Sequence, residues 1–552
     1  MIKLNTAKLI IGILSMTSIF KISIRMCNNE FRAFLAVPVI VTSLFQPQAC
    51  LWSDATRVTA GIYTAEDSDN ADLALKVLRD AEAEDLVIDE ETAGNLIKKV
   101  DRNMMPVLCI VYGLNFLDKT TLTYASIMGL TTPRADGGIG LHGQQYSWLA
   151  SVFYFGYLIG EWPTTRLLQY FPLGKYLAFN IIAWGSILCC FPAATNFGGA
   201  LALRFFLGLL ESSVTPGFAL LTSQWYTAME QGLRINIWFS FNGVAQIFGG
   251  IVAYGISKST KTYEPTIQPW KIIFLVCGLM TVVFGLLFLW IMPDNQTNAR
   301  WLTKENRLLC IQRIKVNQQG IGNRQWKRYQ ALEAVTDPLA WAFVVYSLFS
   351  MIPNGGMTNF FSPLISSFGY TPEQALLYGA PGGAVQIVSL LLSGYLGDKF
   401  QNRLLVSSVG LLIAIVGMSL IAFLPADMKV GRLAGFYLNQ CAICPFVAIL
   451  SLISTNIAGY TKKTTVAAMY LIAYCVGNII GPQTFRGTSW RPAEFTFIGC
   501  YVVCFFDVLL IRWYCLKLNR AKALGGSDES TEGNRQWLDL TDRENPDFRY
   551  RV

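Results

Sequence analysis

The sequence predicts an all-α membrane protein with twelve transmembrane helices in two six-helix halves. Apolar residues make up 53% of the 552 residues and charged residues only 14%, whereas soluble domains carry roughly 25% charged residues. From Pro106 onward, apolar segments recur at about the 20 residues that cross a bilayer. A long polar stretch, residues 293–337, separates the sixth segment from the seventh. The two halves are therefore expected at residues 106–292 and 338–516.

The expected spanning segments follow the apolar runs in chain order. They are Pro106–Met128, Gln145–Arg166, Lys175–Ala194, Gly199–Trp225, Ile235–Ile256, Trp270–Met292, Pro338–Pro363, Gln374–Gly394, Leu404–Leu424, Val430–Ile457, Thr465–Phe485 and Phe495–Leu516. The chain also holds 46 glycines, which let helix backbones approach closely inside a membrane.

The distribution of Lys and Arg predicts the orientation. Cationic residues concentrate in residues 62–105, 293–337 and 517–552 and in alternate short loops. Such segments stay in the cytoplasm. We therefore expect a cytoplasmic N-terminal segment, a cytoplasmic central loop and a cytoplasmic C-terminal tail, in a monomeric integral protein of the plasma membrane.

Residues 1–61 form an atypical leader. Their two apolar runs, Leu9–Phe20 and Ala33–Phe45, are short for a membrane span, and the first resembles a signal-peptide core. A gene-model artefact, such as a mis-joined first exon, would also give a segment of this kind.

Helix 4 carries charges at membrane depth, where ionisable side chains are costly and indicate function. Arg204, Gly208, Glu211 and Thr215 have the 4, 3, 4 spacing of one helical face. An acid and a base two turns apart, about 10 Å, are typical of a transporter that lines a water-filled path. Alternatively, Arg204 is a structural counter-ion to Asp118 in helix 1.

The first two helices add further polar groups. Asn115, Asp118 and Lys119 lie at positions i, i+3 and i+4 of helix 1 and form one patch. Glu161 lies beside Pro163 near the inner end of helix 2, where it serves either the proton pathway or the structure of a gate.

Helices 7 to 11 offer neutral polar side chains instead. These are Asn354, Asn359, Gln386, Asn439, Gln440, Tyr474 and Asn478. All charges at membrane depth are thus expected in the first half. This asymmetry suggests that the first half binds charged groups, while the second half recognises the shape and the hydrogen-bonding groups of a substrate.

Residues 394–403 read GYLGDKFQNR between helices 8 and 9. The pattern resembles the Gly-x-Leu-x-Asp-Arg/Lys-x-x-x-Arg/Lys loop of the major facilitator superfamily. Gly394 and Gly397 would make a tight turn, Asp398 would face a helix N-terminus, and Lys399 and Arg403 would pair across a cytoplasmic gate.

A narrower resemblance runs from about Ala71 to the C-terminus. The chain resembles the anion:cation symporter family, specifically the fungal allantoate permeases. The residues that carry this resemblance read NFLDK at 115–119, GLHGQQY at 140–146, EWPTTR at 161–166, LRFFLGLLE at 203–211, NGGMTNF at 354–360, GNIIGPQ at 477–483 and LDLTDRENPDF at 538–548. Lys119 stands where this family usually has arginine.

The resemblance implies proton-coupled uptake of small organic anions, such as allantoate, ureidosuccinate or related carboxylates and vitamins, across a fungal membrane by alternating access. The partners would be the anion, protons and the lipid bilayer, with the proton gradient as energy source and no cofactor. The planar fork of Arg204 suits a carboxylate. Burial favours the protonated form of a carboxylate, so Glu211 is the first candidate for the proton carrier.

Two alternatives stay open. An efflux transporter for a secondary metabolite usually has a Gly-Pro-rich motif in helix 5, whereas residues 242–250 contain glycines and no proline. A membrane enzyme or nutrient sensor would need a metal cluster, a nucleophile motif or a long signalling tail, and the sequence has no such pattern. The scattered basic residues give no support for nucleic-acid binding.

Overall fold

The computed structural model describes residues 90–263, 267–315, 326–400, 402–486, 490–524, 540–546 and 548–551. Over these residues, all regular secondary structure is helical, and loops and turns connect the helices. The leader, residues 1–61, and the first part of the N-terminal segment, residues 62–89, lie outside these ranges. The predicted all-α class is confirmed.

The helices of the first half occur where the apolar runs predict them. They are α4 (Glu90–Ala125), α5 (Gln145–Tyr170), α6 (Leu173–Cys190), α7 (Phe197–Glu211), α8 (Val214–Trp225), α9 (Ala228–Tyr263) and α10 (Pro269–Ile291). Helix α4 starts 16 residues before Pro106. The proline is accommodated inside this helix, which therefore begins before the span predicted from Pro106.

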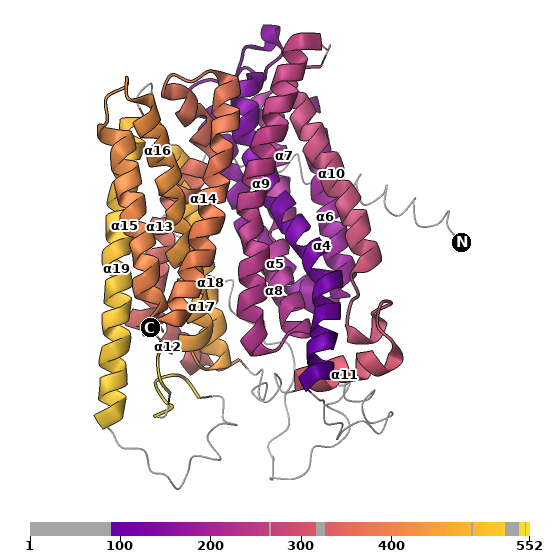
Figure 1. Ribbon diagram of the computed structural model, residues 1–552, viewed down its shortest axis with the longest axis vertical. Helices are drawn as coiled ribbons and strands as arrows, with labels where there is room; N and C mark the ends of the chain where they lie inside the picture. The colour runs from indigo at the N-terminus through magenta and orange to yellow at the C-terminus, as the bar shows by residue number, and fades with distance from the viewer. Residues whose placement is uncertain are drawn as a thin grey trace. The chain divides into compact units, whose positions relative to one another are not determined.

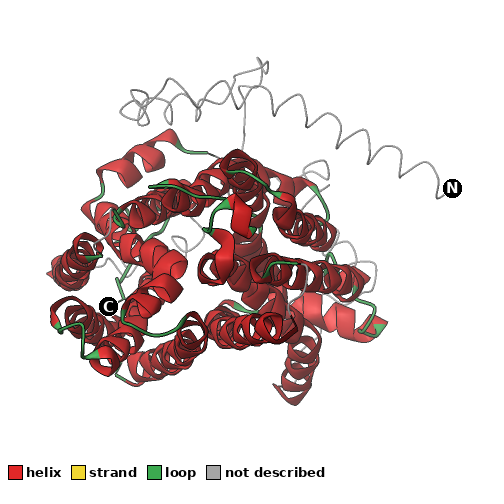
Figure 2. Ribbon diagram, turned by 90° about the horizontal axis from the view of Figure 1, so that it is seen from above, coloured by secondary structure: helices red, strands yellow, loops and turns green. Residues whose placement is uncertain are grey.

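The second half follows a polar connection that is itself partly helical. The connection holds α11 (Lys304–Lys315) and α12 (Arg328–Thr336), and the second half contains α13 (Pro338–Ser367), α14 (Pro372–Lys399), α15 (Arg403–Phe423), α16 (Lys429–Asn439), α17 (Cys444–Asn456), α18 (Tyr460–Gln483) and α19 (Arg491–Leu524). The helices of each half run side by side in Figure 1 and are seen end-on in Figure 2.

Helices 4 and 10 are each interrupted near the middle. Ser212 and Ser213 separate α7 from α8, and a 3-10 turn, Gln440–Ile443, separates α16 from α17. Ser212 keeps right-handed helical dihedrals, so Phe197–Trp225 still runs as one span. The interruptions occupy the fourth helix of each half, which the sequence had presented as continuous.

Ten spans of the described residues are long and apolar enough to cross a membrane. Helices α4 and α5 are the two remaining members of the twelve. Asn115, Asp118 and Lys119 lower the mean hydropathy of α4, so these polar residues weaken the membrane signal of that helix.

The two halves meet mainly through three pairs of helices. These pairs are α4 with α13, α5 with α18, and α9 with α14. We call the end that carries α11 and α12, lower in Figure 1, the inner end, after the predicted orientation, and the opposite end the outer end.

Close helix packing fixes the position of helix 4. A Cβ at Gly208 would collide with the carbonyl oxygen of Phe153, and a Cβ at Gly156 with that of Phe205. Glycine at both positions lets α5 and α7 touch backbone to backbone. This contact holds the polar face of α7 against α4 and α5. Gly355 and Gly481 pack α13 against α18 in the same way.

Candidate functional site

The most polar site inside the membrane lies around Glu211, at the end of α7. Asn115 of α4 donates a hydrogen bond from Nδ2 to Glu211 Oε2 at 2.7 Å. Lys119 Nζ lies 2.9 Å from Asn115 Oδ1 and 3.7 Å from Glu211 Oε2. Two of the three residues of the predicted helix 1 patch, Asn115 and Lys119, therefore lie at the predicted carboxylate. Glu211 is fully buried, whereas 16% of the Lys119 side chain is exposed.

Asp118 points away from this group. Its Oδ2 accepts hydrogen bonds from Trp184 Nε1 at 2.6 Å and from Thr281 Oγ1 at 3.1 Å. Its Oδ1 is buried and has no hydrogen-bond donor among the described residues. Asp118 therefore links α4 to α6 and α10, inside the first half.

Arg204 is also buried inside the first half. It is 1% exposed, and its guanidinium carbon lies 5.7 Å from the centre of the Phe191 ring. Among the described residues, none accepts a hydrogen bond from Arg204 Nε or Nη2. Lys119 is thus the partly exposed cation of this region, and Arg204 is the enclosed one.

A cavity lies between the two halves. It holds about 660 Å³ of empty space, part of which is open to solvent. Four predicted residues of the second half line it, namely Asn354, Gln386, Asn439 and Gln440. Phe116, Thr120 and Gln246 contribute from the first half. Within the described part of the chain, every residue that lines the cavity is uncharged.

The other predicted residues of the second half do not line this cavity. Asn359 and Asn478 donate their Nδ2 hydrogens to Gly355 O and Tyr474 O, one turn earlier in their own helices. The Tyr474 ring lies 6.4 Å from that of Tyr157.

Aromatic rings connect the cavity to the charged site. Lys119 Nζ lies 5.8 Å from the centre of the Tyr157 ring. Tyr474, next to Tyr157, lies 6.2 Å from Phe446, which lines the cavity. A continuous aromatic wall therefore runs from the Lys119 ammonium to the neutral cavity, and it includes residues of both halves.

Glu161 lies on α5, one turn inward from Tyr157. Its Oε2 is buried and makes no hydrogen bond to any described residue, and its carbonyl accepts a bond from Thr165 Oγ1 at 2.8 Å. Either predicted role, proton pathway or gate structure, stays a prediction.

At the outer end the two halves are bonded together. Tyr146 of α5 donates its hydroxyl hydrogen to Asn359 O of α13 at 2.7 Å. That carbonyl is free because the residue four positions later is Pro363, which has no N–H. Ser151 donates to Ile479 O at 2.7 Å, and Lys261 pairs with Glu373. The cavity is thus closed toward this end. No motif in the sequence identified these contacts.

The gate motif adopts a different local structure from the expected one. Helix α14 continues to Lys399, so Gly394 and Gly397 are helical and do not form a tight turn. Gly397 instead allows close approach, because a Cβ there would lie 3.1 Å from Arg403 Cγ. Arg403 Nη1 lies 3.2 Å from Ser451 Oγ in α17, so it bonds within the second half. Asp398 belongs to the last turn of α14.

The expectation that all charges at membrane depth belong to the first half was wrong. Asp507 lies within α19, is buried, and has one carboxylate oxygen without a hydrogen bond to any described residue. Its run of apolar neighbours identifies the membrane span but does not reveal that the aspartate faces the bundle interior.

Comparison with known proteins agrees with this architecture. The family model of the Major Facilitator Superfamily matches residues 108–482. An uncharacterized transporter of Schizosaccharomyces pombe is 41% identical over 470 residues, covering 84% of this chain and 90% of the relative. The allantoate permease of Saccharomyces cerevisiae is 37% identical over 503 residues, covering 88% and 90%.

A solved structure shares the fold. The crystal structure of a D-xylose-proton symporter matches with a TM-score of 0.57 at 16% identity, over 74% of this chain and 96% of that protein. The relatives are transporters rather than enzymes, and they move small molecules through a membrane. This chain therefore belongs to the major facilitator superfamily, among the fungal transporters related to the allantoate permease.

Proposed function

We propose that this protein is a proton-coupled symporter that carries small organic anions into the cell by alternating access. The observation that carries the proposal is the group formed by Lys119, Asn115 and Glu211, in which a partly exposed cation shares a buried site with a carboxylate. This group supplies both an anion-binding site and a proton-binding site.

Proton binding and anion binding would support each other at this site. When Glu211 takes up a proton it loses its charge, and Lys119 loses its nearest anionic partner. A substrate carboxylate can then replace Glu211 as the counter-ion of Lys119. Without the proton, the substrate must compete with Glu211. Binding of the anion and of the proton is therefore linked.

The remainder of the substrate would occupy the neutral cavity. Its amide side chains offer hydrogen bonds, and the aromatic wall from Tyr157 to Phe446 joins it to Lys119. The similarity to the allantoate permease makes small carboxylates, allantoate included, the first substrates to test. Arg204 would not contact the substrate, and its positive charge would offset the buried carboxylates of the first half.

The proposal includes an orientation. Both termini and the central connection would face the cytoplasm, because Lys and Arg concentrate there, and the protein would work as a monomer in the plasma membrane. Hydrogen bonds between the two halves close the outer end. In the proposed orientation, this conformation would be closed toward the outside of the cell.

Uptake by a transporter-deficient fungal cell tests the proposal. The cells would receive a panel of labelled small carboxylates, allantoate included, at two external pH values. We expect at least one anion to accumulate, more strongly at the lower pH, and to be lost when a protonophore collapses the gradient. Uptake that responds to neither pH nor protonophore would contradict proton coupling.

A further inference from the structure

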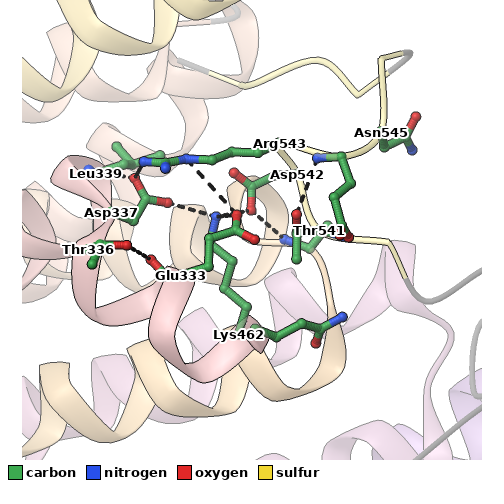
Figure 3. Close-up of polar contacts among 12 residues, drawn as sticks. Glu333, Thr336, Asp337, Leu339, Lys462, Thr541, Asp542, Arg543 and Asn545 are labelled. Carbon is green, nitrogen blue, oxygen red and sulfur yellow. Dashed lines mark hydrogen bonds and ion pairs between the residues drawn. The ribbon is translucent and has the colours of Figure 1, made fainter. Parts of the chain in front are cut away.

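The described part of the C-terminal segment, residues 540–546 and 548–551, packs against the inner end of the second half. We call this segment the strap. Its Asp542 lies 2.7 Å from the ammonium of Lys462, in the first turn of α18 (Figure 3). Asp337 and Glu333 approach the same ammonium at 2.7 Å and 2.9 Å. Lys462 has no exposed side-chain surface. Burial of a charge is expensive unless partners compensate it, so the strap completes a site that the helices leave unfinished.

The cluster joins segments that are far apart in the sequence. Glu333 belongs to α12, and Asp337 caps the start of α13 by accepting from Leu339 N at 3.1 Å. Arg543 of the strap also bonds Asp337, at 2.9 Å (Figure 3). The strap therefore holds the inner ends of α13 and α18 together through charges of alternating sign.

Two asparagines bind the backbone of the strap. Asn456 donates to Arg551 O and accepts from Arg551 N, each at 2.8 Å. Asn519 of α19 makes the same pair with Tyr550, again at 2.8 Å for both bonds. Each amide side chain thus satisfies both backbone groups of one residue, as a neighbouring β-strand would. Two such clamps fix the register of the segment.

The side chains of the strap keep Asp542 in place. Tyr550 donates its hydroxyl hydrogen to Asp542 Oδ2 at 2.8 Å. Burial and the Asp542 carboxylate raise the pKa of Tyr550, so the phenol keeps its proton and remains a donor. Thr541 and Glu544 form a reciprocal capping pair at 2.9 Å and 3.2 Å, and Lys522 of α19 donates to Asn545 O at 2.6 Å.

The helices that the strap joins are those that meet the first half. Helix α13 packs against α4, and α18 packs against α5. A rocking motion between the halves must move the inner ends of α13 and α18. The two helices already pack against each other at Gly355 and Gly481, and the strap adds a connection between their inner ends.

We propose that the strap is a positioning element of the transport cycle, which couples α13 to α18 so that the inner gate opens as a unit. It neither contacts the cavity nor selects the substrate. The inference rests on the transporter family alone, and it holds whichever substrate or coupling ion the protein uses.

Binding in trans tests the strap directly. The full chain, cut after folding in lipid nanodiscs at a protease site introduced before residue 540 and washed free of the released segment, should bind a labelled synthetic peptide of residues 540–552 saturably. The same peptide with Asp542→Asn should bind at least about tenfold more weakly, because it loses a buried charge-assisted contact. Equal binding of the two peptides would overturn the role of Asp542.

A conformational measurement separates positioning from simple stabilisation. Spin labels at Leu233 of α9 and Tyr395 of α14, both exposed near the inner end, would report the distance between the halves. In the full chain, we expect Asp542→Asn to broaden this distance distribution at a temperature where the protein stays folded. Addition of the unmodified peptide to the cut chain should restore the narrow distribution.

The matched control is Arg549→Ala in the full chain. Arg549 is exposed, and among the described residues its side chain bonds Pro546 O and Phe548 O, both within the strap, so its removal should leave the distribution unchanged. If Asp542→Asn lowers the melting temperature but leaves the distance distribution as narrow as in the parent, the strap is structural only and the proposal fails. The readout needs no substrate, so this failure would leave the symport proposal untouched.

Discussion

Two lysines, one in each half, show different uses of charge. Lys462 of the second half has carboxylates from three segments within 2.9 Å and no exposed side-chain surface. Lys119 of the first half has one carboxylate at 3.7 Å and is 16% exposed. The position of the Lys462 ammonium is therefore fixed by its carboxylates, while Lys119 can exchange Glu211 for another anion.

The surroundings of the two lysines narrow this contrast. Near Lys119 the first half contains buried atoms that lack hydrogen-bond partners among the described residues, such as Asp118 Oδ1, Glu211 Oε1 and Arg204 Nε. Unsatisfied buried groups cost free energy in the resting protein, and a folded protein tolerates them where function requires them. The second half also contains such atoms, Asp507 Oδ2 among them, so the contrast lies in the two lysines themselves: three carboxylates surround Lys462, whereas Lys119 has one carboxylate at 3.7 Å.

The largest effect should come from Lys462→Met. Methionine would leave Glu333, Asp337 and Asp542 facing one another with only Arg543 to balance them. Loss of one partner of a buried pair costs about 3–5 kcal/mol. We expect most of the folded protein to disappear, as measured by fluorescence-detected size exclusion.

Two control variants accompany this prediction. The neighbouring Lys463, which bonds only Ser454 O among the described residues, should tolerate methionine with a loss under about 1 kcal/mol. Lys462→Arg should recover part of the folded protein because it keeps the charge. A stable Lys462→Met protein would mean that the contrast between the two lysines is false.

Lys119→Met should remove transport but not the fold. Glu211 can become neutral by binding a proton and would still accept the hydrogen bond from Asn115, so no unpaired charge is left behind. The anion loses its cation, and uptake of the labelled carboxylate should fall at least about 100-fold, the size of a lost charge-assisted contact. Lys119→Arg should retain uptake. Lys258→Met, at an exposed position near the outer end, is the control.

Glu211→Gln should have a narrower effect. Glutamine keeps the hydrogen-bonding shape but cannot carry a proton, so accumulation against a gradient should stop while exchange of preloaded substrate continues nearly unchanged. Both are measured in the same proteoliposomes, with and without a pH gradient. A variant that still accumulates substrate in a pH-dependent way would exclude Glu211 as the proton carrier and direct attention to Asp118 or Glu161.

The sequence predicted the local features of the molecule well. A helix occurs at each of the twelve predicted segments, and ten of the spans are apolar enough to cross a membrane, because membrane insertion depends on the composition of each segment by itself. Helical periodicity placed Asn115 and Lys119 on one face, and the structure brings that face to Glu211. These predictions need only geometry within one helix, together with the rule that charges avoid lipid.

Features that join distant segments could not be predicted in this way. Lys462 and Asp542 are 80 residues apart, and no periodicity connects a helix to a tail. The burial of Arg204 within its half depends on how α7 packs against its neighbours, which is set by the backbone contact at Gly208. Asp507 was missed for the same reason, since the direction in which a side chain of α19 points depends on the neighbouring helices.

The smallest predicted effect concerns the outer end, where the halves are bonded together rather than separated by a cavity. Tyr146→Phe removes one hydroxyl and leaves Asn359 O without its donor, because Pro363 cannot supply an N–H. A hydrogen bond makes a net contribution of about 1 kcal/mol to the stability of the conformation that contains it. Its loss corresponds to about a fivefold shift toward the outward-open state.

A cysteine at Thr358, which lines the cavity, should therefore react about five times faster with an impermeant thiol reagent applied to intact cells. Tyr170→Phe, at an exposed tyrosine, should leave the rate unchanged. Equal rates in all three proteins would show that the stacked rings of Phe360 and Phe485, 4.1 Å apart, hold the outer end closed without the hydroxyl.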